Sequence, residues 1–147
     1  MEKVIIKGKV ISVNVSKEKG VVKDPVAEIE LKVNHGIVGD AHAGDWHRQV
    51  SLLGIESYEK MRAHDLELSN GDFAENITTE GVILYELPIG TKLSIGDTIL
   101  EVTQIGKKCH SGCAISVRTG DCVMPKEGIF CKVIKNGIIK VDDTITK

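Results

Sequence analysis

Fifteen glycines are spread along the 147-residue chain, and their spacing sets the length of the elements that can form between them. Most of the segments they leave are short apolar runs bounded by turn residues, a pattern typical of brief β-strands. In one segment, apolar residues alternate with charged ones, at Ala27, Ile29, Leu31 and Val33. Alternation at every second residue predicts a strand with one face toward solvent. The glycine spacing and this alternation together predict a mainly β fold.

Six further strands are predicted, at residues 3–15, 75–79, 92–93, 98–103, 130–135 and 138–141. Asn136-Gly137 separates the last two, and this dipeptide favours a two-residue hairpin. Apolar residues at three- and four-residue steps predict one amphipathic helix from about 54 to 67, with Ser51 as its cap. Because closure removes exposed strand edges, we expect a small closed or nearly closed β-barrel of short strands with one or two helices. It would form a single domain over residues 1–147.

Composition excludes several classes of partner. Nineteen Lys and Arg against 21 Asp and Glu give a net charge of −2, and 3% of residues are aromatic, so a nucleic-acid partner is not expected. No apolar run approaches the roughly 20 residues of a membrane-spanning helix. Residues 1–7 are too charged for the apolar part of a signal peptide. We therefore expect a cytoplasmic protein with no membrane partner, whose four cysteines are reduced thiols.

Two His, two Asp, one Arg and the only Trp gather in residues 39–48, a segment framed by glycines. Its candidate ligand-binding residues are Asp40, His42 and Arg48. One interpretation is a polar surface loop whose side chains form ordinary hydrogen bonds. The other is an anion-binding loop, with Arg48 and backbone N–H groups toward the negative charge. The spacing of His42 and His47 is ambiguous for a metal site, and the pattern alone leaves these interpretations open.

All four cysteines lie in the last third of the chain, at Cys109, Cys113, Cys122 and Cys131. A thiol reacts as the thiolate, and neighbouring cations lower its pKa. Two lysines, one of them Lys108, precede Cys109 directly, and His110 follows it. The small Gly and Ser residues nearby indicate an accessible loop. Cys109 is therefore the candidate reactive thiol.

A structural zinc site is the competing interpretation of these cysteines. Such sites often contain two pairs of cysteines spaced by two to four residues. Cys109 and Cys113 form one such pair, but eight residues separate Cys113 from Cys122, so half of the pattern is present. Cys131 lies in an apolar segment and is predicted to be a small core residue.

Residues 71–79 gather short hydrogen-bonding side chains at the entrance to a predicted strand. Asn76, Thr78 and Thr79 have two interpretations that the pattern does not separate. They satisfy the backbone of a turn, or they offer donors and acceptors to a polar ligand.

In their order along the chain, these motifs resemble the MOSC domain, named for the C-terminal domain of molybdenum cofactor sulfurase. The matching segments are 36–44 (GIVGDAHAG), 49–53 (QVSLL), 72–81 (DFAENITTEG), 87–90 (LPIG), 95–97 (IGD), 102–109 (VTQIGKKC) and 128–130 (GIF). Each segment is short, but their order and spacing over nearly the whole chain make the resemblance fairly specific. It is to the stand-alone, bacterial-type members, which are similar to this chain in size.

The resemblance implies a β-barrel-like fold and a protein that carries sulfur as a persulfide on a cysteine. The sulfur would come from a NifS-like cysteine desulfurase, so pyridoxal phosphate (PLP) would enter only through that partner. It would pass to a metal–sulfur centre of an acceptor protein or to the molybdenum cofactor (molybdopterin). The characteristic cysteine of the family falls on Cys109, with Lys108 and His110 stabilising its charge and Cys113 or Cys122 releasing the sulfur. The acceptor pocket would be lined by Asp40, His42, Arg48, Asn76 and Thr78.

The chain departs from the family pattern in two places. Many members have Pro and Arg before the characteristic cysteine, where this chain has Gly106 and two lysines. Cys113 and Cys122 look like features of one branch, and their roles as resolving thiols, metal ligands or structural residues stay open. A Cys/His metal-binding module of the zinc type is the alternative to a sulfurtransferase. An enzyme acting on a small thiol or N-oxygenated compound is the third hypothesis.

Overall fold

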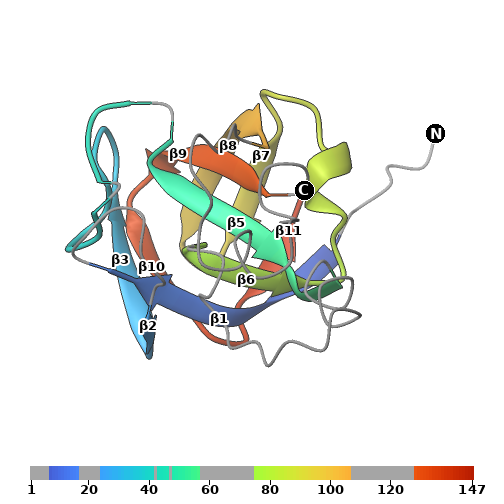
Figure 1. Cartoon of the computed structure of the whole chain (residues 1–147), viewed down its shortest axis with the longest axis horizontal. Helices are drawn as coiled ribbons and strands as arrows, with labels where there is room; N and C mark the ends of the chain where they lie inside the picture. The colour runs from blue at the N-terminus through green and yellow to red at the C-terminus, as the bar shows by residue number, and fades with distance from the viewer. Residues whose placement is uncertain (1–6, 17–23, 42, 47, 57–74, 107–127) are drawn as a thin grey trace, which may run out of the picture.

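The computed structural model describes residues 7–16, 24–41, 43–46, 48–56, 75–106 and 128–147 (Figure 1). Regular structure in this part of the chain is almost entirely β. The strands are β1 (Lys7–Val15), β2 (Asp24–Val26), β3 (Glu28–Lys32), β4 (Gly36–Ile37), β5 (Val50–Gly54), β6 (Ile77–Glu80), β7 (Lys92–Ile95), β8 (Thr98–Ile105), β9 (Ile129–Lys135), β10 (Gly137–Lys140) and β11 (Thr144–Thr146). A short 3-10 helix, η1 (Leu84–Glu86), lies between β6 and β7.

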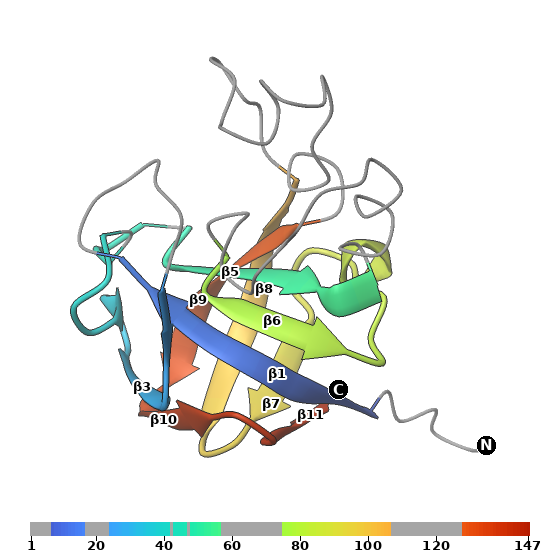
Figure 2. The same cartoon turned by 60° about the horizontal axis from the view of Figure 1, so that its bottom comes forward.

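Seven of the described strands form a closed ring. The sheet order is β11-β7-β8-β9-β5-β6-β1, with β2 added beside β1, and a further pairing joins β11 to β1. At this closing seam Lys7 lies opposite Thr146. Neighbours in the ring are antiparallel except for β5 and β6, which are parallel. Figure 2 shows β1, β6 and β5 crossing one wall with β8 behind them. The predicted mainly β, closed barrel is confirmed.

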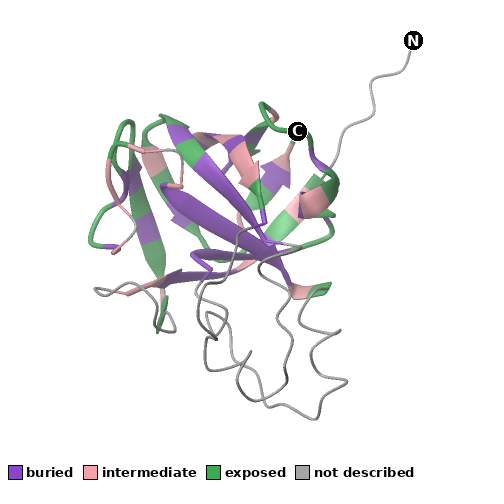
Figure 3. Cartoon of the chain, turned by 45° about the horizontal axis from the view of Figure 1, so that its top comes forward, coloured by how far each residue is buried: buried purple, intermediate pink, exposed green. Residues whose placement is uncertain are grey.

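The core of the barrel is made by alternating strand residues. Along β3, Ile29 and Leu31 are buried while the three residues around them are exposed, which confirms the alternation predicted from the sequence. β5 is buried along its whole length, and Figure 3 shows it as a continuous purple strand. Burial on both faces of β5 means that side chains cover the outside of the barrel wall here as well as the inside.

The hairpin predicted at Asn136-Gly137 is wrong. β9 pairs with β5 and β8, whereas β10 pairs with β3 in a separate sheet of order β10-β3-β4. Two contacts explain the change of sheet. Asn136 Oδ1 accepts a hydrogen bond from Val33 N at 2.7 Å. Gly137 lies so close to Asp97 that a Cβ would stand 2.9 Å from the Asp97 carbonyl carbon. The dipeptide therefore carries the chain from one sheet to the other.

Ser51 is not a helix cap, which corrects the second local prediction. It lies inside β5, opposite Phe130 of β9. A strand is favoured here because β5 has paired neighbours on both sides, β6 and β9. The helix predicted from about 54 to 67 is observed at residues 55 and 56, and its residues 57–67 lie outside the described residues. In the part of the chain that is described, no helix is long and apolar enough to cross a membrane.

Candidate functional site

The residues predicted to carry sulfur chemistry lie outside the described part of the chain. They are Lys108, Cys109, His110, Cys113 and Cys122, and His42 of the predicted ligand loop lies outside it too. Their roles stay predictions. The structure does place the other four predicted ligand residues, Asp40, Arg48, Asn76 and Thr78, and it places both ends of the segment 107–127 that contains the three cysteines.

Gly106 and Gly128 are bonded to each other at the two ends of the segment 107–127. Gly106 N donates a hydrogen bond to the Gly128 carbonyl at 2.6 Å. The Gly106 backbone has a φ of +70°, which favours glycine, and Gln104 Nε2 donates to the Gly106 carbonyl at 2.7 Å. The two ends of the segment 107–127 therefore lie side by side at one point of the barrel, and the chain turns there at Gly106.

A β-bulge precedes this turn. The β8–β9 register shifts between Val102 and Gln104, so Thr103 is the extra residue. Its hydroxyl donates to the Phe130 carbonyl at 3.1 Å. Bulges bend a strand and are frequent beside functional sites. Here the bulge sets the direction of the last residues of β8. The segment 107–127, which we call the cysteine segment, follows them after Gly106.

Buried polar side chains line the outer face of the barrel wall near this point. Val13, Leu52, Ile77 and Ile129 belong to the apolar core. Because strand side chains alternate between faces, their neighbours along each strand point to the other side of the wall. Five of these neighbours are polar and at most 4% exposed, and we call them the polar face: Ser12, Asn14, Ser51, Asn76 and Thr78.

Hydrogen bonds join the members of the polar face across β1, β5 and β6. Ser12 Oγ donates to Asn14 Oδ1 at 2.5 Å, and Asn14 Nδ2 donates to Thr78 Oγ1 at 3.3 Å. Thr78 Oγ1 donates in turn to Glu75 Oε2 at 2.8 Å. Glu75 is fully buried, so this contact places a carboxyl group inside the protein. Buried polar groups are stable when they are bonded in this way.

Asn76 has its side-chain amide bonded on both sides. Its Oδ1 accepts from Ser51 N at 3.0 Å and from Ser51 Oγ at 3.1 Å. Its Nδ2 donates to the Asn14 carbonyl at 3.1 Å. Of the two interpretations left open by the sequence, this geometry favours satisfaction of the local backbone for Asn76. Thr78 is also fully buried, and its hydroxyl bonds to two side chains, those of Asn14 and Glu75.

Asp40 also bonds to backbone. It is 6% exposed, and its Oδ1 accepts from Ser16 N at 3.1 Å just after β1. Ala41 N donates to the Ser16 carbonyl at 2.7 Å, so two bonds attach the loop 39–48 to the end of β1. Within the described residues, Asp40 positions this loop on the barrel.

Arg48 contacts aromatic rings, unlike the other predicted ligand residues that the structure describes, which form hydrogen bonds. Its guanidinium carbon lies 4.8 Å from the centre of the Trp46 ring and 5.6 Å from that of Phe130. Phe130 pairs with Ser51 of the polar face, so their side chains share one side of the wall. It is also two residues beyond Gly128, where the cysteine segment ends. The structure therefore brings the loop 39–48 and the base of the cysteine segment to the same part of the barrel.

Cys131 is the free cysteine among the described residues, and it is fully buried in the core. Burial in apolar surroundings raises the pKa of its thiol far above the ordinary value, and the nearby Glu101 carboxylate adds to the effect. A thiol held neutral and out of water is a poor nucleophile. The prediction that Cys131 is a core residue is confirmed.

No group of three or more His, Cys, Asp or Glu side chains that could hold a metal ion occurs within the described ranges. The metal-binding alternative therefore rests on cysteines outside those ranges.

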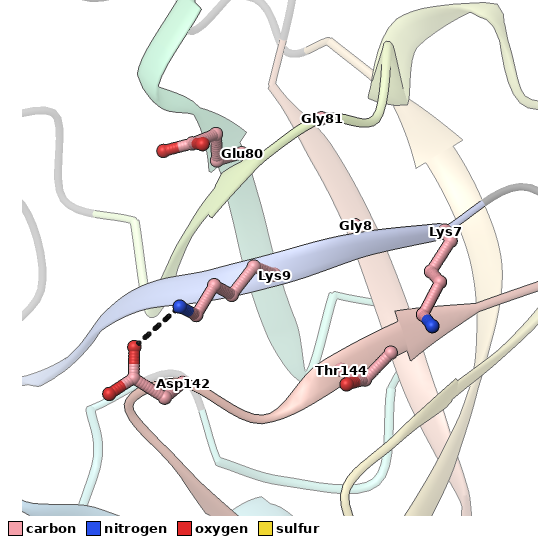
Figure 4. Close-up of a pocket in the computed structure, with 7 residues that line it drawn as sticks. All are labelled: Lys7, Gly8, Lys9, Glu80, Gly81, Asp142 and Thr144. Carbon is pink, nitrogen blue, oxygen red and sulfur yellow. Dashed lines mark ion pairs between the residues drawn. The ribbon is translucent and has the colours of Figure 1, made fainter.

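A shallow pocket of about 320 Å³ lies at the seam that closes the barrel (Figure 4). Its lining comes from the start of β1, the end of β6 and the chain around β11, and includes an ion pair between Lys9 Nζ and Asp142 Oδ1 at 3.2 Å. Both side chains of this pair are more than half exposed, so the pair contributes little binding or stability. The start of β1 is the strand end away from Asn14, so the pocket is separate from the polar face.

Several residues of this region carry little distinct signal in the sequence. The pattern predicts only a strand at Asn14 and a helix cap at Ser51, and it includes Gln104 only as part of a motif. One signal was present for Asn14, because a polar residue stands in an apolar strand segment, Val13-Asn14-Val15. Nothing local pointed to Phe130 as the partner of Arg48, since the two are distant in sequence.

The family model of the MOSC domain matches residues 39–146, most of the chain. The chain belongs to the MOSC domain family. No curated protein matches the sequence. The match of this MOSC domain covers the loop 39–48, the polar residues of β5 and β6 and the whole of β8 and β9, whereas Ser12, Asn14 and Ser16 lie before it.

Solved structures share the fold of this MOSC domain. The YuaD protein from Bacillus subtilis has a TM-score of 0.82 and 18% identity, with 97% of this chain and 96% of that one aligned. YiiM from Geobacillus stearothermophilus has a TM-score of 0.72 and 18% identity over 95% of this chain and 75% of its own. YiiM from Escherichia coli has a TM-score of 0.69 and 19% identity over 95% and 68%. At these identities the likeness establishes the fold.

Proposed function

We propose that this MOSC domain is a sulfur carrier that holds a persulfide on Cys109. A NifS-like, PLP-dependent cysteine desulfurase supplies the sulfur, and the acceptor is a metal–sulfur centre of another protein or the molybdenum cofactor. The observation that supports the proposal best is the base of the cysteine segment. Gly106 and Gly128 fix it at one point of the barrel, and Arg48 lies over Phe130 beside it.

The transfer is an exchange between thiolate and persulfide. The Cys109 thiolate attacks the outer sulfur of the donor persulfide, and the S–S bond of the donor breaks, so the donor cysteine leaves as a thiolate. Lys108 and His110 stabilise the negative charge on Cys109. The Cys113 or Cys122 thiolate then attacks the inner sulfur of Cys109. Hydrosulfide leaves toward the acceptor, and the resulting disulfide is reduced by an external dithiol.

The described residues fit the molybdenum cofactor only in part. A phosphate-bearing cofactor needs a cation or N–H donors, and Arg48 supplies a guanidinium. Asn76 and Thr78 do not offer free groups in the same way, because their side chains bond to β1, β5 and Glu75. In this proposal Asp40, Asn76 and Thr78 position the wall and the loop. His42 remains a candidate contact. Bound cofactor would supply the molybdenum that accepts sulfur.

The test is anaerobic incubation of the full chain with a cysteine desulfurase and cysteine, followed by peptide mass mapping of all four thiols. We expect one extra sulfur on Cys109, removable by reductant. Cys109→Ser should abolish loading, whereas the matched variant Cys131→Ala should load normally because Cys131 lies in the core. Full loading of Cys109→Ser, or no sulfur on any thiol of folded, reduced protein, would overturn the proposal.

A further inference from the structure

Arg48 is a half-buried cation without a protein partner among the described residues. Its Nε is buried and has no hydrogen-bond partner there. Its interactions are the two ring contacts, to Trp46 and Phe130. Asp40, the buried carboxylate of the same loop, accepts its hydrogen bond from Ser16 N. A guanidinium has five N–H donors, so this side chain retains most of its hydrogen-bonding capacity.

Such an arrangement is unfavourable unless the guanidinium has a ligand. Leaving a buried donor unpaired costs about 1–3 kcal/mol, and more for a charged group. Stacking on two aromatic rings returns part of this through cation–π attraction. The rings also hold the guanidinium plane in place, which lowers the entropy lost when it binds something. Arg48 is therefore prepared for a partner that accepts hydrogen bonds and carries negative charge.

We propose that Arg48, held between Trp46 and Phe130, is the binding site for an oxyanion group of a small molecule, a phosphate or a carboxylate. A guanidinium donates two parallel hydrogen bonds to either group, with a geometry that lysine does not reproduce. The apolar rings beside it reduce the competition of water, which strengthens the electrostatic attraction.

This inference rests on the proposed function, in which Arg48 supplies the cation for a phosphate-bearing acceptor, and it names the group that the guanidinium binds; the binding itself requires no thiol. Phe130 is two residues from Gly128, so an anion on Arg48 would lie beside the base of the cysteine segment. The polar face holds Phe130 in place, because Ser51 pairs with Phe130 across β5 and β9 and its hydroxyl bonds to Asn76. Asn76 and Ser51 therefore act as positioning residues for the strand that presents Phe130.

Trp46 is the only tryptophan in the chain, so its fluorescence reports directly on the ring that contacts Arg48. The full chain would be titrated with inorganic phosphate and, separately, with acetate, at an ionic strength kept constant with sodium chloride. Calorimetric titration gives a second readout that does not depend on Trp46. We expect a saturable response to phosphate, to acetate, or to both, and the stronger of the two identifies the group that the site prefers.

The matched variants are Arg48→Lys and Arg48→Gln. Arg48→Gln should weaken binding at least tenfold, which corresponds to about 1.4 kcal/mol. Arg48→Lys keeps the charge but loses the paired donors, so its affinity for the anion should lie between that of the wild type and that of Arg48→Gln. Urea unfolding shows whether each variant is folded, and the Lys variant carries the test if Arg48→Gln does not fold.

No saturable response of the wild type to either anion would overturn the inference, and so would equal affinity in folded Arg48→Gln. Failure of Cys109 loading with anion binding intact would contradict the proposed sulfur transfer only. Normal loading without anion binding would contradict this site only.

Discussion

Buried polar side chains at single positions decide how much of this molecule is free to bind ligands. Asn76 and Thr78 were ligand candidates from the sequence, but each bonds to neighbouring strands. Arg48 was a candidate on the same grounds and has only aromatic contacts among the described residues. At this scale, the difference between a structural residue and a binding residue is the number of donors left without a partner.

Asn76→Ala should destabilise the protein strongly. The change leaves Ser51 N and the Asn14 carbonyl without their side-chain partner inside the protein. At about 1–3 kcal/mol for each buried group left unpaired, we expect a loss of about 3 kcal/mol in the free energy of unfolding. Urea denaturation measures it. Asn136→Ala is the matched control, because its one side-chain bond, to Val33 N, is exposed and its loss should be below about 1 kcal/mol. Equal losses in the two variants would contradict the prediction.

Cys131 should make stability depend on pH above the ordinary thiol pKa of about 8.5. Burial raises the pKa of this thiol in the folded protein. Above pH 8.5 the unfolded chain therefore releases the proton while the folded chain keeps it, and stability falls as pH rises. The largest slope for one proton is about 1.4 kcal/mol per pH unit.

The measurement compares wild type with Cys131→Ala by urea unfolding between pH 8 and pH 10. As pH rises, the free energy of unfolding of the wild type should fall relative to that of Cys131→Ala. A difference that stays constant across this range would show that the thiol titrates alike in both states.

Whether the surroundings of a residue could be predicted depended on how far away in the sequence its contacting residues lie. The core position of Cys131 was predictable, because its apolar neighbours are adjacent in the chain. The Arg48–Phe130 contact was not, because it requires β5 and β9 to pair first. The bonds of Asn76 to Ser51 and Asn14 likewise need three strands to be in register.

Elements were predicted well where a pattern of alternation existed and poorly where a turn signal stood alone. β3 and β8 were expected close to their observed ranges. Asn136-Gly137 suited a hairpin, but hairpin formation also requires the two strands to prefer each other. β9 already has partners on both edges, β5 and β8, so β10 pairs with β3 instead.

Gly137→Ala tests this change of sheet. A Cβ at this position would lie 2.9 Å from three atoms of Asp97, two of them backbone. Backbone atoms cannot move aside as a flexible side chain would, so we expect a loss of about 1–3 kcal/mol, the usual range for overpacking. Thermal and urea unfolding both measure it. A loss below about 0.5 kcal/mol, as for an ordinary surface substitution, would show that β10 can shift without cost.

The ring of seven strands joins the first described strand, β1, to the last, β11. Closure depends on β11, which joins β7 to β1 with only three residues. The sequence indicated closure only through a general argument about strand edges. It could not show which strands meet at the seam, because that depends on pairing between the first and last described strands.

Ile145→Ala should lower stability throughout the barrel. Ile145 is fully buried in the core, and removing its side chain should reduce the free energy of unfolding by about 2–5 kcal/mol. Each strand of a closed ring has neighbours on both sides, so we expect the barrel to unfold as one unit. Trp46 fluorescence and far-ultraviolet circular dichroism should then report the same lowered midpoint, although Trp46 belongs to the loop 39–48 and not to the seam. An unchanged Trp46 midpoint beside a lowered dichroism midpoint would show that the barrel unfolds in parts.

The position of the seam also affects how the protein is made. Synthesis starts at the N-terminal side, so β1 is the first described strand to leave the ribosome and β11 is the last. Until residues 144–146 have been made, the edge of β1 that pairs with β11 has no partner from its own chain. Lys7 and Lys9 lie at this edge and are exposed. Charged side chains on an open strand edge discourage pairing with other chains, so we expect these two lysines to hinder such pairing until residues 144–146 have been made.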